Sequence, residues 1–500
     1  MYKILLTIIC SAFCLVAFAQ EKVDNLFLDR DFLKTKPSVE VVKQKIAEGH
    51  DPTEKDLFGF DAVSYGILDE IPNETLKYLL TLEGNPVTKP THGDLPYLLW
   101  AAYRGNTEIV KHLLELGSDI HFASSRGTNI LLMSGIGGQE DIELYKLMFS
   151  NGVDPNYTSD SKLNILLALA RSDAKDENLY QYLIEKGLDW HSQDEEGNGF
   201  FHYSAMAGNV ENMKMALREG VDFKVMNANG ENAMFYATYG RRRREVKLET
   251  FMFMDSLGLD ADIVNWEGQT PLHYAVRNGN TEVIDFFLDR GVNINQIDKN
   301  GNTAFMNSIF GDVENVEKLV PLVDDINRIN HKGQSALSRT VIYSLKDAFN
   351  HLVDQGADLA VIDENGDDLI SLAFQNYSDR RKESFEQILT VITDKGMVAQ
   401  KSYASGNTLI HFAIEKNSAF LVEKALEMNA NPNFKNELGL TALHLAAMKA
   451  TDSEIIDMLL NFGADKRILT DFEESPHDLA SENEILIFNK TDISQLQLQD

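Results

Sequence analysis

Four of the twelve histidines in this 500-residue chain occupy similar surroundings, and they are the first residues whose spacing could support chemistry. His273 lies in the segment "GQTPLHYAVRNGN", and related segments hold His202, His411 and His444. As a metal site this set fails on distance. Only His411 and His444 lie in adjacent segments, and neighbouring helices are separated by roughly 8–10 Å, whereas the ligands of one zinc ion lie at about 2.0–2.1 Å. We therefore predict no metal site.

The sequence also lacks the common motifs of catalysis and cofactor binding. It contains no nucleophile elbow, P-loop, dinucleotide-binding glycine motif, HExxH helix or EF-hand loop. Acidic pairs such as Asp324-Asp325 and Asp367-Asp368 stand near expected turns without a consistent opposing partner, so solvated turns account for them. We predict no catalytic residues and no cofactor, and the alternative of an enzyme stays open.

Two arginine-rich insertions could bind anions, because each is expected in a turn between two helices. They are "RRRREVKLE" and "DRRKESFE", and their cations are Arg241, Arg242, Arg243, Arg244, Arg380, Arg381 and Lys382. With 77 acidic and 46 basic residues the chain has a formal charge of −31, so these are local positive islands. The same acidity excludes nucleic acid as a general partner. We interpret the insertions either as solvated loops or as arginine forks that dock an acidic protein patch or an anionic ligand.

The elements that must position these residues recur along the chain. A glycine or its equivalent marks the same turn at positions 59, 93, 127, 162, 197, 230, 268, 301, 333, 366, 406, 439 and 473, mostly 32 to 35 residues apart. Each unit is expected to contain a polar turn, a short apolar helix, a tight turn and a second helix. Thr270 is placed to cap the first helix of its unit, and Pro271 to occupy the first turn of that helix. A fixed period near 33 residues predicts a solenoid instead of several independent domains.

The residue after the histidine position indicates how the units pack. It is apolar or aromatic in ten of twelve units, as a buried face requires: Tyr65, Trp100, Met133, Ala168, Tyr203, Tyr236, Tyr274, Asn307, Arg339, Leu372, Phe412 and Leu445. The next residue is small in nearly every unit, which lets neighbouring helices approach closely. We interpret the aromatic residues in this column as core and not as a cofactor site.

Over roughly residues 25 to 486, this pattern resembles the ankyrin-repeat family, which carries T-P-L-H-x-A. The closest matches are Thr270, Pro271, Leu272, His273 and Ala275, and the later segment "GLTALHLAA". The resemblance implies an all-α solenoid of helix-turn-helix units joined by β-hairpin-like turns, with about twelve repeats plus partial caps. It also implies that the imidazoles hydrogen-bond the cap threonine and nearby backbone and so tie one repeat to the next. The structural positions are then Thr270, Pro271, His202, His273, His411 and His444.

The first 19 residues are expected to be a signal peptide cleaved after Ala19, because a lysine precedes an apolar run and an "AFA" cleavage site. The mature chain is expected to be exported, periplasmic or secreted, monomeric and without a membrane span. A transmembrane or lipid anchor in this segment, which holds both cysteines, is the alternative. Beyond it we expect an N-terminal capping segment at 20–57, the repeat array at 58–470, and a C-terminal capping repeat with a polar tail at 471–500.

The turn tips just before the marker glycines vary between repeats, and in ankyrin-repeat stacks they border the concave face. Trp266 stands out, because large aromatic anchors are enriched in binding hot spots; packing on an adjacent tip is the other interpretation. Arg126, Lys299 and Lys332 are further candidates for partner binding. We predict a scaffold that binds another protein through its concave face and tips and supports or inhibits a periplasmic partner. The alternative is a binder of an anionic glycan, lipid headgroup or phosphate through the arginine-rich turns.

Overall fold

The computed structural model describes residues 25–240, 245–400 and 402–498 of the chain. The expected signal peptide and the run Arg241, Arg242, Arg243 and Arg244 lie outside the described residues. Within the described residues the chain forms 28 α-helices and no β-strand, which confirms the predicted all-α fold. The hairpin character of the connecting turns is limited to isolated antiparallel bridges, each a single pair of residues, such as Ile297 with Thr303.

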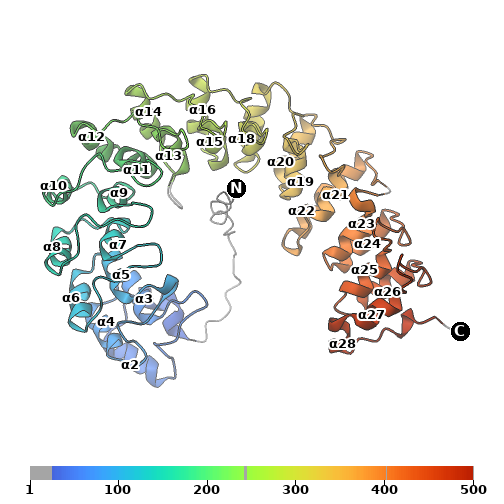
Figure 1. Cartoon of the computed structure of the whole chain (residues 1–500), viewed down its shortest axis with the longest axis horizontal. Helices are drawn as coiled ribbons and strands as arrows, with labels where there is room; N and C mark the ends of the chain where they lie inside the picture. The colour runs from blue at the N-terminus through green and yellow to red at the C-terminus, as the bar shows by residue number, and fades with distance from the viewer. Residues whose placement is uncertain (1–24, 241–244, 401, 499–500) are drawn as a thin grey trace. The chain divides into compact units, whose positions relative to one another are not determined.

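The helices follow one another in pairs and group into two compact units, Met1–Ala228 with Gly240–Val246 and Asn229–Tyr239 with Lys247–Asp500 (Figure 1). In unit 1 the first helices of the pairs are α1 (Arg30–Lys34), α3 (Ala62–Leu68), α5 (Tyr97–Tyr103), α7 (Ile130–Ile136), α9 (Ile165–Ala170) and α11 (Phe200–Ala207). The second helices are α2 (Val39–Ala47), α4 (Asn73–Leu80), α6 (Thr107–Glu115), α8 (Ile142–Ser150), α10 (Glu177–Glu185) and α12 (Val210–Arg218). The first helices α5, α7 and α9 lie along the inner edge of this unit, and α6, α8 and α10 along its outer edge (Figure 1).

Unit 2 continues the same alternation. Its first helices are α13 (Ala233–Tyr239), α15 (Leu272–Asn278), α17 (Ala304–Ser308), α19 (Ala336–Ile342), α21 (Leu369–Gln375), α23 (Leu409–Glu415), α25 (Ala442–Lys449) and α27 (Pro476–Glu482). Its second helices are α14 (Leu248–Ser256), α16 (Thr281–Asp289), α18 (Val313–Leu319), α20 (Lys346–Asp354), α22 (Lys382–Asp394), α24 (Ala419–Glu427), α26 (Glu454–Asn461) and α28 (Glu484–Asn489). Over the described residues the 28 helices make 14 pairs, in agreement with about twelve repeats between two terminal pairs.

The two kinds of helix differ in how much surface they bury. All six residues of α9 are buried, because α9 packs between the neighbouring first helices α7 and α11. The second helix α16 instead buries Val283, Ile284, Phe286 and Phe287, a stripe at helical spacing, and turns its other residues to solvent. We call the surface formed by the first helices and the turn tips, opposite the second helices, the first-helix side.

The marker turns confirm the repeat register at the level of the backbone. Every marker position has a positive φ, including the two where the sequence has no glycine, Lys162 (61°) and Glu473 (65°). At Gly268, where φ is 79°, an added Cβ would lie 3.0 Å from the carbonyl oxygen of Ile297 in the next repeat. Glycine is favoured there both by the left-handed backbone and by the close approach of the next turn.

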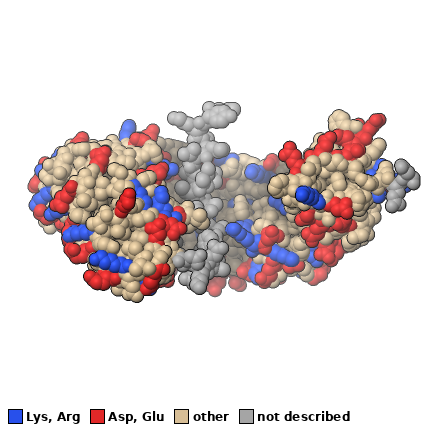
Figure 2. Space-filling model, turned by 90° about the horizontal axis from the view of Figure 1, so that it is seen from below, with Lys and Arg blue, Asp and Glu red and all other residues tan. Residues whose placement is uncertain are grey.

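Charged side chains cover the surface in mixed patterns. On the face drawn in Figure 2, Asp and Glu are interspersed with Lys and Arg over both units. Some opposite charges join neighbouring repeats, as in Arg290 with Asp255 at 2.6 Å and Lys435 with Asp471 at 3.3 Å. Each exposed pair of this kind contributes at most about 1 kcal/mol to stability. Among the described residues, no helix combines the length and the apolar character that crossing a membrane requires.

Candidate functional site

The turn tips are closed by the same hydrogen bonds in successive repeats. The backbone N–H of Asn265 donates to the carbonyl oxygen of Gln269 at 2.9 Å, and the Asn265 side-chain oxygen accepts from the backbone N–H groups of Glu267 (3.0 Å) and Gln269 (2.9 Å). One repeat later, Asp298 makes the corresponding bonds to Asn300 and Asn302. An Asx residue three positions before the marker therefore fixes the tip, because its side chain satisfies the turn's own backbone donors.

A second set of bonds joins successive tips within unit 2. In unit 2, the backbone N–H of Lys299 donates to the Glu267 carbonyl oxygen at 2.8 Å, and that of Glu364 donates to the Lys332 carbonyl oxygen at 2.9 Å. Side chains add to these links: the Asn330 amide donates to the Asn302 side-chain oxygen at 2.9 Å. From Asn229 to Glu364, backbone hydrogen bonds thus link the tips of unit 2 into a row that carries variable side chains.

Trp266 is held in this row from two directions. Its backbone N–H donates to the Asn229 carbonyl oxygen at 2.9 Å, and its ring covers Gly230, where an added Cβ would lie 2.8 Å from the indole. The side chain is nevertheless 60% exposed. The indole therefore packs on the adjacent tip, as one interpretation of the sequence expected. It also keeps a large exposed aromatic surface, which the other interpretation requires for binding a partner.

The three basic tip residues differ in their surroundings. Lys299 pairs with Glu267 at 3.1 Å, so part of its charge is already compensated. Arg126 and Lys332 are exposed, and neither takes part in an ion pair within the described residues. These last two remain the better candidates for contact with an acidic partner.

Large apolar residues at other tips were missed by the sequence reasoning. Leu57 and Phe58 in unit 1, and Leu438 and Phe472 in unit 2, are exposed one or two positions before their marker residues. The signal was present in the sequence, because these residues occupy the two positions before the marker, one of which holds Trp266 in its own repeat. They extend the apolar character of the tip row beyond one tryptophan.

The described arginine insertion is only partly a turn. A 3-10 helix, Asp379–Arg381, precedes α22, which has 13 residues where most second helices have nine, so Lys382 is the first residue of a longer helix. Arg381 donates to the Tyr343 carbonyl oxygen at 2.9 Å, and the Lys382 ammonium lies 4.0 Å from the ring centroid of Phe420. Arg380 is exposed without an ion pair in the described residues. Protein contacts therefore occupy two of these three cations.

The four repeat histidines hold the starts of first helices. The Nδ1 atom of His273 accepts from the Thr270 backbone N–H at 3.0 Å and lies 3.0 Å from the Thr270 hydroxyl. Pro271, the residue before α15, already has helical backbone angles. His444 repeats this contact with its own cap threonine, and His202 accepts from a glycine N–H at 3.3 Å. His411 adds a contact across repeats.

In His411 the Nε2 atom donates to the Leu440 carbonyl oxygen of the next repeat at 3.1 Å. Because Nδ1 accepts the N–H of Thr408, the proton of the neutral ring lies on Nε2. Burial lowers the pKa of His411, and it lowers the pKa values of His273 and His444 in the same way. These rings are neutral connectors at neutral pH and not exposed acid–base groups.

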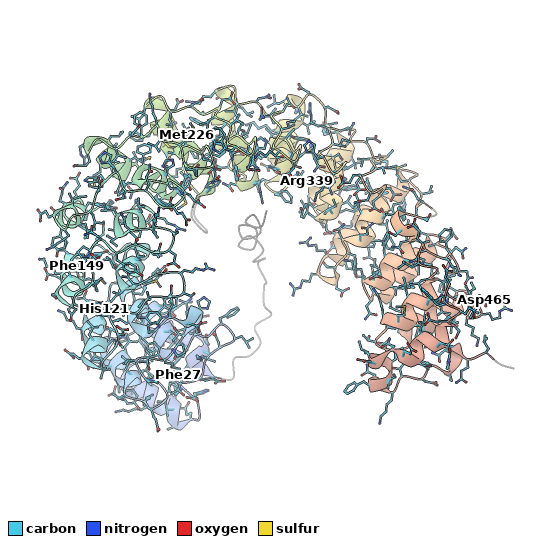
Figure 3. The ribbon with its side chains drawn as sticks, in the orientation of Figure 1. Phe27, His121, Phe149, Met226, Arg339 and Asp465 are labelled. Carbon is cyan, nitrogen blue, oxygen red and sulfur yellow. The ribbon has the colours of Figure 1, made fainter. Side chains whose placement is uncertain are left out.

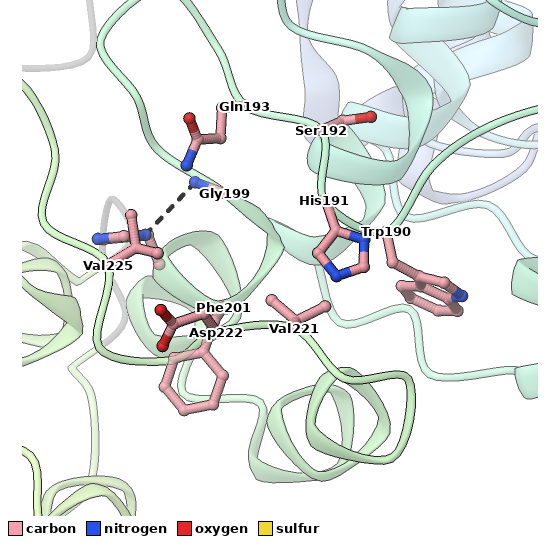
Figure 4. Close-up of a pocket in the computed structure, with 10 residues that line it drawn as sticks. Trp190, His191, Ser192, Gln193, Gly199, Phe201, Val221, Asp222 and Val225 are labelled. Carbon is pink, nitrogen blue, oxygen red and sulfur yellow. Dashed lines mark hydrogen bonds between the residues drawn. The ribbon is translucent and has the colours of Figure 1, made fainter.

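The cavity beside one of these histidines, His202, is too small for a typical ligand. The cavity in Figure 4 is lined by Trp190, His191, Phe201 and Val221 among others and measures about 80 Å³. Ligand sites in proteins usually have about 300–1,000 Å³. Among the described residues, no group of three or more His, Cys, Asp or Glu side chains is arranged to hold a metal ion.

A polar cluster on the first-helix side of unit 2 was also missed. Arg339, labelled in Figure 3, belongs to α19 and is only 9% exposed. Its guanidinium donates to the Met306 carbonyl oxygen at 2.7 Å and approaches the Asn307 side-chain oxygen at 3.3 Å. The Asn307 amide donates in turn to the His273 carbonyl oxygen at 3.3 Å. The signal was again present, because Asn307 and Arg339 are the two polar residues in the otherwise apolar column.

Stacked helix pairs whose turn tips are joined by hydrogen bonds define a helical-repeat protein. The chain belongs to the ankyrin-repeat family: the family model for ankyrin repeats in three copies matches residues 98–194, 248–330 and 370–470, more than half of the chain. Repeats of this family in general mediate protein–protein interaction, and their fold is in general a non-enzymatic scaffold.

Individual relatives share only part of their length with this chain. A putative ankyrin repeat protein of Acanthamoeba polyphaga mimivirus is 23% identical over 227 residues, which are 44% of this chain and 28% of that protein. A putative ankyrin repeat protein of Fowlpox virus (strain NVSL) is 29% identical over 138 residues, 27% of this chain and 39% of that protein. The chain thus spans less than half the length of these relatives. The crystal structure of the human ASB11 ankyrin repeat domain is 22% identical, with a TM-score of 0.34, and the match covers 45% of this chain and 96% of that domain.

Proposed function

We propose that this chain is an exported ankyrin-repeat scaffold, periplasmic or secreted, which binds a protein partner through its turn tips and first-helix side and supports or inhibits that partner. The observation that carries the proposal is Trp266, an indole that is 60% exposed and yet fixed by its neighbours. A side chain that is already ordered loses little conformational entropy on binding, so its contact area is available for affinity.

The export part of the proposal rests on the amino-acid sequence of residues 1–19. N-terminal sequencing of the protein from its native host tests it directly. We expect the mature chain to begin at Gln20. An intact first methionine, or recovery of the protein only from the cytosolic fraction, would contradict export without touching the binding proposal.

Affinity capture with three forms of the protein tests the binding part. The wild type, Trp266→Ala and a control, Phe488→Ala, are immobilised and exposed to periplasmic extract and culture medium of the host. Phe488 is a suitable control because it is 85% exposed but lies on the last helix and not at a tip. We expect one protein to be enriched on the wild type and the control and to be reduced about tenfold on Trp266→Ala, the scale of a hot-spot residue. Equal capture by all three forms would contradict the role of the tips.

The alternative, binding of an anionic glycan, lipid headgroup or phosphate, has less support in the described insertion. All three cations are exposed, but Arg381 and Lys382 already contact Tyr343 and Phe420, and within the described residues Arg380 alone has no such contact. Replacing Arg241 to Arg244 by serine tests the other insertion. Loss of a salt-sensitive ligand in that variant, together with full binding by Trp266→Ala, would favour the alternative.

A further inference from the structure

Two guanidinium groups on the first-helix side of unit 2 share one aromatic ring. The Arg277 guanidinium carbon lies 5.4 Å from the ring centroid of Phe310, and that of Arg339 lies 5.3 Å from the same centroid. Tyr343 packs edge-on against Phe310, with ring centroids 4.8 Å apart at 76°. We call these four residues the Phe310 cluster. They come from three consecutive repeats, so the stacking of the repeats assembles them.

No carboxylate pairs directly with the two arginines of this cluster among the described residues, although the charge of Asp298 acts on Arg339 from a distance. Within the described residues, neither Arg277 nor Arg339 takes part in an ion pair. The Asp298 carboxylate is buried in its tip, where it accepts backbone N–H groups of that turn. Burial lowers the pKa of Arg339, and the nearby positive charge of Arg277 lowers it as well. Tyr343 and Asp298 act in the opposite direction and raise the pKa of Arg339. A buried cation without a counter-ion is costly, so an added anion would be stabilised here.

The two arginines are unequally available to a ligand. The Arg339 donors are engaged by Met306 and Asn307, so this residue acts as a fixed positive charge. Arg277 is exposed at the end of α15, and no hydrogen bond of its side chain is found among the described residues. Its planar fork of donors matches the two oxygens of a carboxylate.

We propose that the Phe310 cluster binds a carboxylate side chain in an acidic segment of the protein partner, with Arg277 as the fork and Arg339 as the charge behind it. This inference rests on the proposed function, because it assumes that the partner is a protein. Tyr343, 43% exposed, and Phe310 offer apolar surface beside the charge, which an Asp or Glu stem and its neighbours can cover and a free phosphate cannot. Aromatic and arginine side chains together are typical of interface hot spots.

A predicted site residue lies next to this cluster. Arg381 donates to the Tyr343 carbonyl oxygen at 2.9 Å, so the arginine insertion adjoins the cluster, and the exposed Arg380 beside Arg381 has no ion pair among the described residues. The acidic segment can therefore continue past the carboxylate held by Arg277. The cluster would then contribute one anchor point in a contact that crosses several repeats.

The test measures binding of the full mature chain to an end-capped peptide, Gly-Glu-Phe-Glu-Gly-Glu, by fluorescence anisotropy with an uncharged dye. The variants are Arg277→Gln, which removes the fork and the charge, and Arg277→Lys, which keeps the charge alone. Arg328→Gln is the control, because this arginine of unit 2 has no ion pair within the described residues, lies in the connection between η3 (Val320–Leu322) and α19, and makes no contact with the Phe310 ring among the described residues. We expect Arg277→Gln to raise the Kd about tenfold, Arg277→Lys to raise it less, and Arg328→Gln to leave it unchanged. Unchanged thermal midpoints confirm that the variants are folded.

Three results would overturn the inference: no binding of the peptide to the wild type, an equal loss with Arg328→Gln, or displacement of the peptide by inorganic phosphate at constant ionic strength. The inference and the proposed function can fail separately. A captured protein that depends on Trp266 but not on Arg277 would leave the scaffold function standing and remove the carboxylate site. Peptide binding that depends on Arg277, with no protein captured from the host, would do the reverse.

Discussion

Replacing His411 by alanine is expected to lower the stability of unit 2 while leaving partner binding by the folded protein intact. The imidazole is fully buried and connects two repeats. Its Nδ1 atom accepts from the Thr408 backbone N–H at 3.1 Å and lies 2.8 Å from the Thr408 hydroxyl, and its Nε2 atom donates to the Leu440 carbonyl oxygen at 3.1 Å. Alanine removes both sides of the bridge and fills little of the space.

The size of the effect follows from what is left unpaired. Each buried hydrogen bond contributes about 1 kcal/mol net, and a buried group stranded without its partner costs about 1–3 kcal/mol. The truncation strands the Thr408 N–H and removes one of two hydrogen bonds to the Leu440 carbonyl, which still accepts from the Asn436 N–H at 2.9 Å. The lost packing of the ring adds to this cost, and part of it is relieved if water enters. We expect a loss of about 2–4 kcal/mol in the free energy of unfolding.

Urea unfolding followed by circular dichroism measures this loss, with His331→Ala as the control. His331 is exposed at a tip, so its removal is expected to change stability by less than about 0.5 kcal/mol. Repeat stacks can unfold in parts, so amide hydrogen exchange in α23 and α25 should locate the weakened interface. A stability loss no larger than that of the control would refute the connector role, and lost binding at unchanged stability would give the histidine a functional one.

Two further predictions use other parts of the repeat. Burial lowers the pKa values of His273, His411 and His444 below the ordinary 6.5, so the unfolded chain takes up their protons first. Their contribution to stability is complete above about pH 6.5 and is lost as the pH falls below that value. The urea midpoint of the wild type should therefore decline below pH 6.5, and that of His411→Gln should decline less steeply. A midpoint that rises in this range would contradict the burial of neutral imidazoles. Gly268→Ala is expected to cost about 1 kcal/mol more than Gly463→Ala, because both need a positive φ but only Gly268 has backbone of the next repeat at 3.0 Å from the added Cβ. Equal thermal shifts in the two variants would show that the next turn gives way.

The repeat period and the register could be predicted because they depend on local chemistry. Each marker turn requires a left-handed residue, and glycine meets that requirement at low cost, so the turn leaves its mark on the sequence at a nearly constant interval. Lys162 and Glu473 test the register most strictly, since they were assigned by spacing alone and both have a positive φ. The helix pairs followed from the same spacing.

The surroundings of the candidate binding residues could not be predicted, because they depend on contacts between repeats. Nothing in the sequence near Lys299 shows that Glu267, in the preceding tip, compensates its charge. Similarly, nothing in the sequence near Arg381 and Lys382 shows that these cations contact Tyr343 and Phe420 of the neighbouring repeats. A charge that is isolated in the sequence can be satisfied by a residue one period away.

The exceptions to the repeat pattern are therefore more informative when they occur in adjacent repeats. A single polar residue at the position after the repeat histidine, which is apolar in most repeats, would leave a buried polar group without a hydrogen-bond partner. Such a group costs stability. Asn307 and Arg339 occur next to each other and satisfy each other in part, which makes the substitution tolerable. Mutual hydrogen bonding does not neutralise the guanidinium, however, because an amide brings no negative charge. Apolar residues at both positions would pack the column without this cost. A guanidinium beside Phe310 that forms no ion pair among the described residues is therefore in keeping with the proposed carboxylate site on the first-helix side.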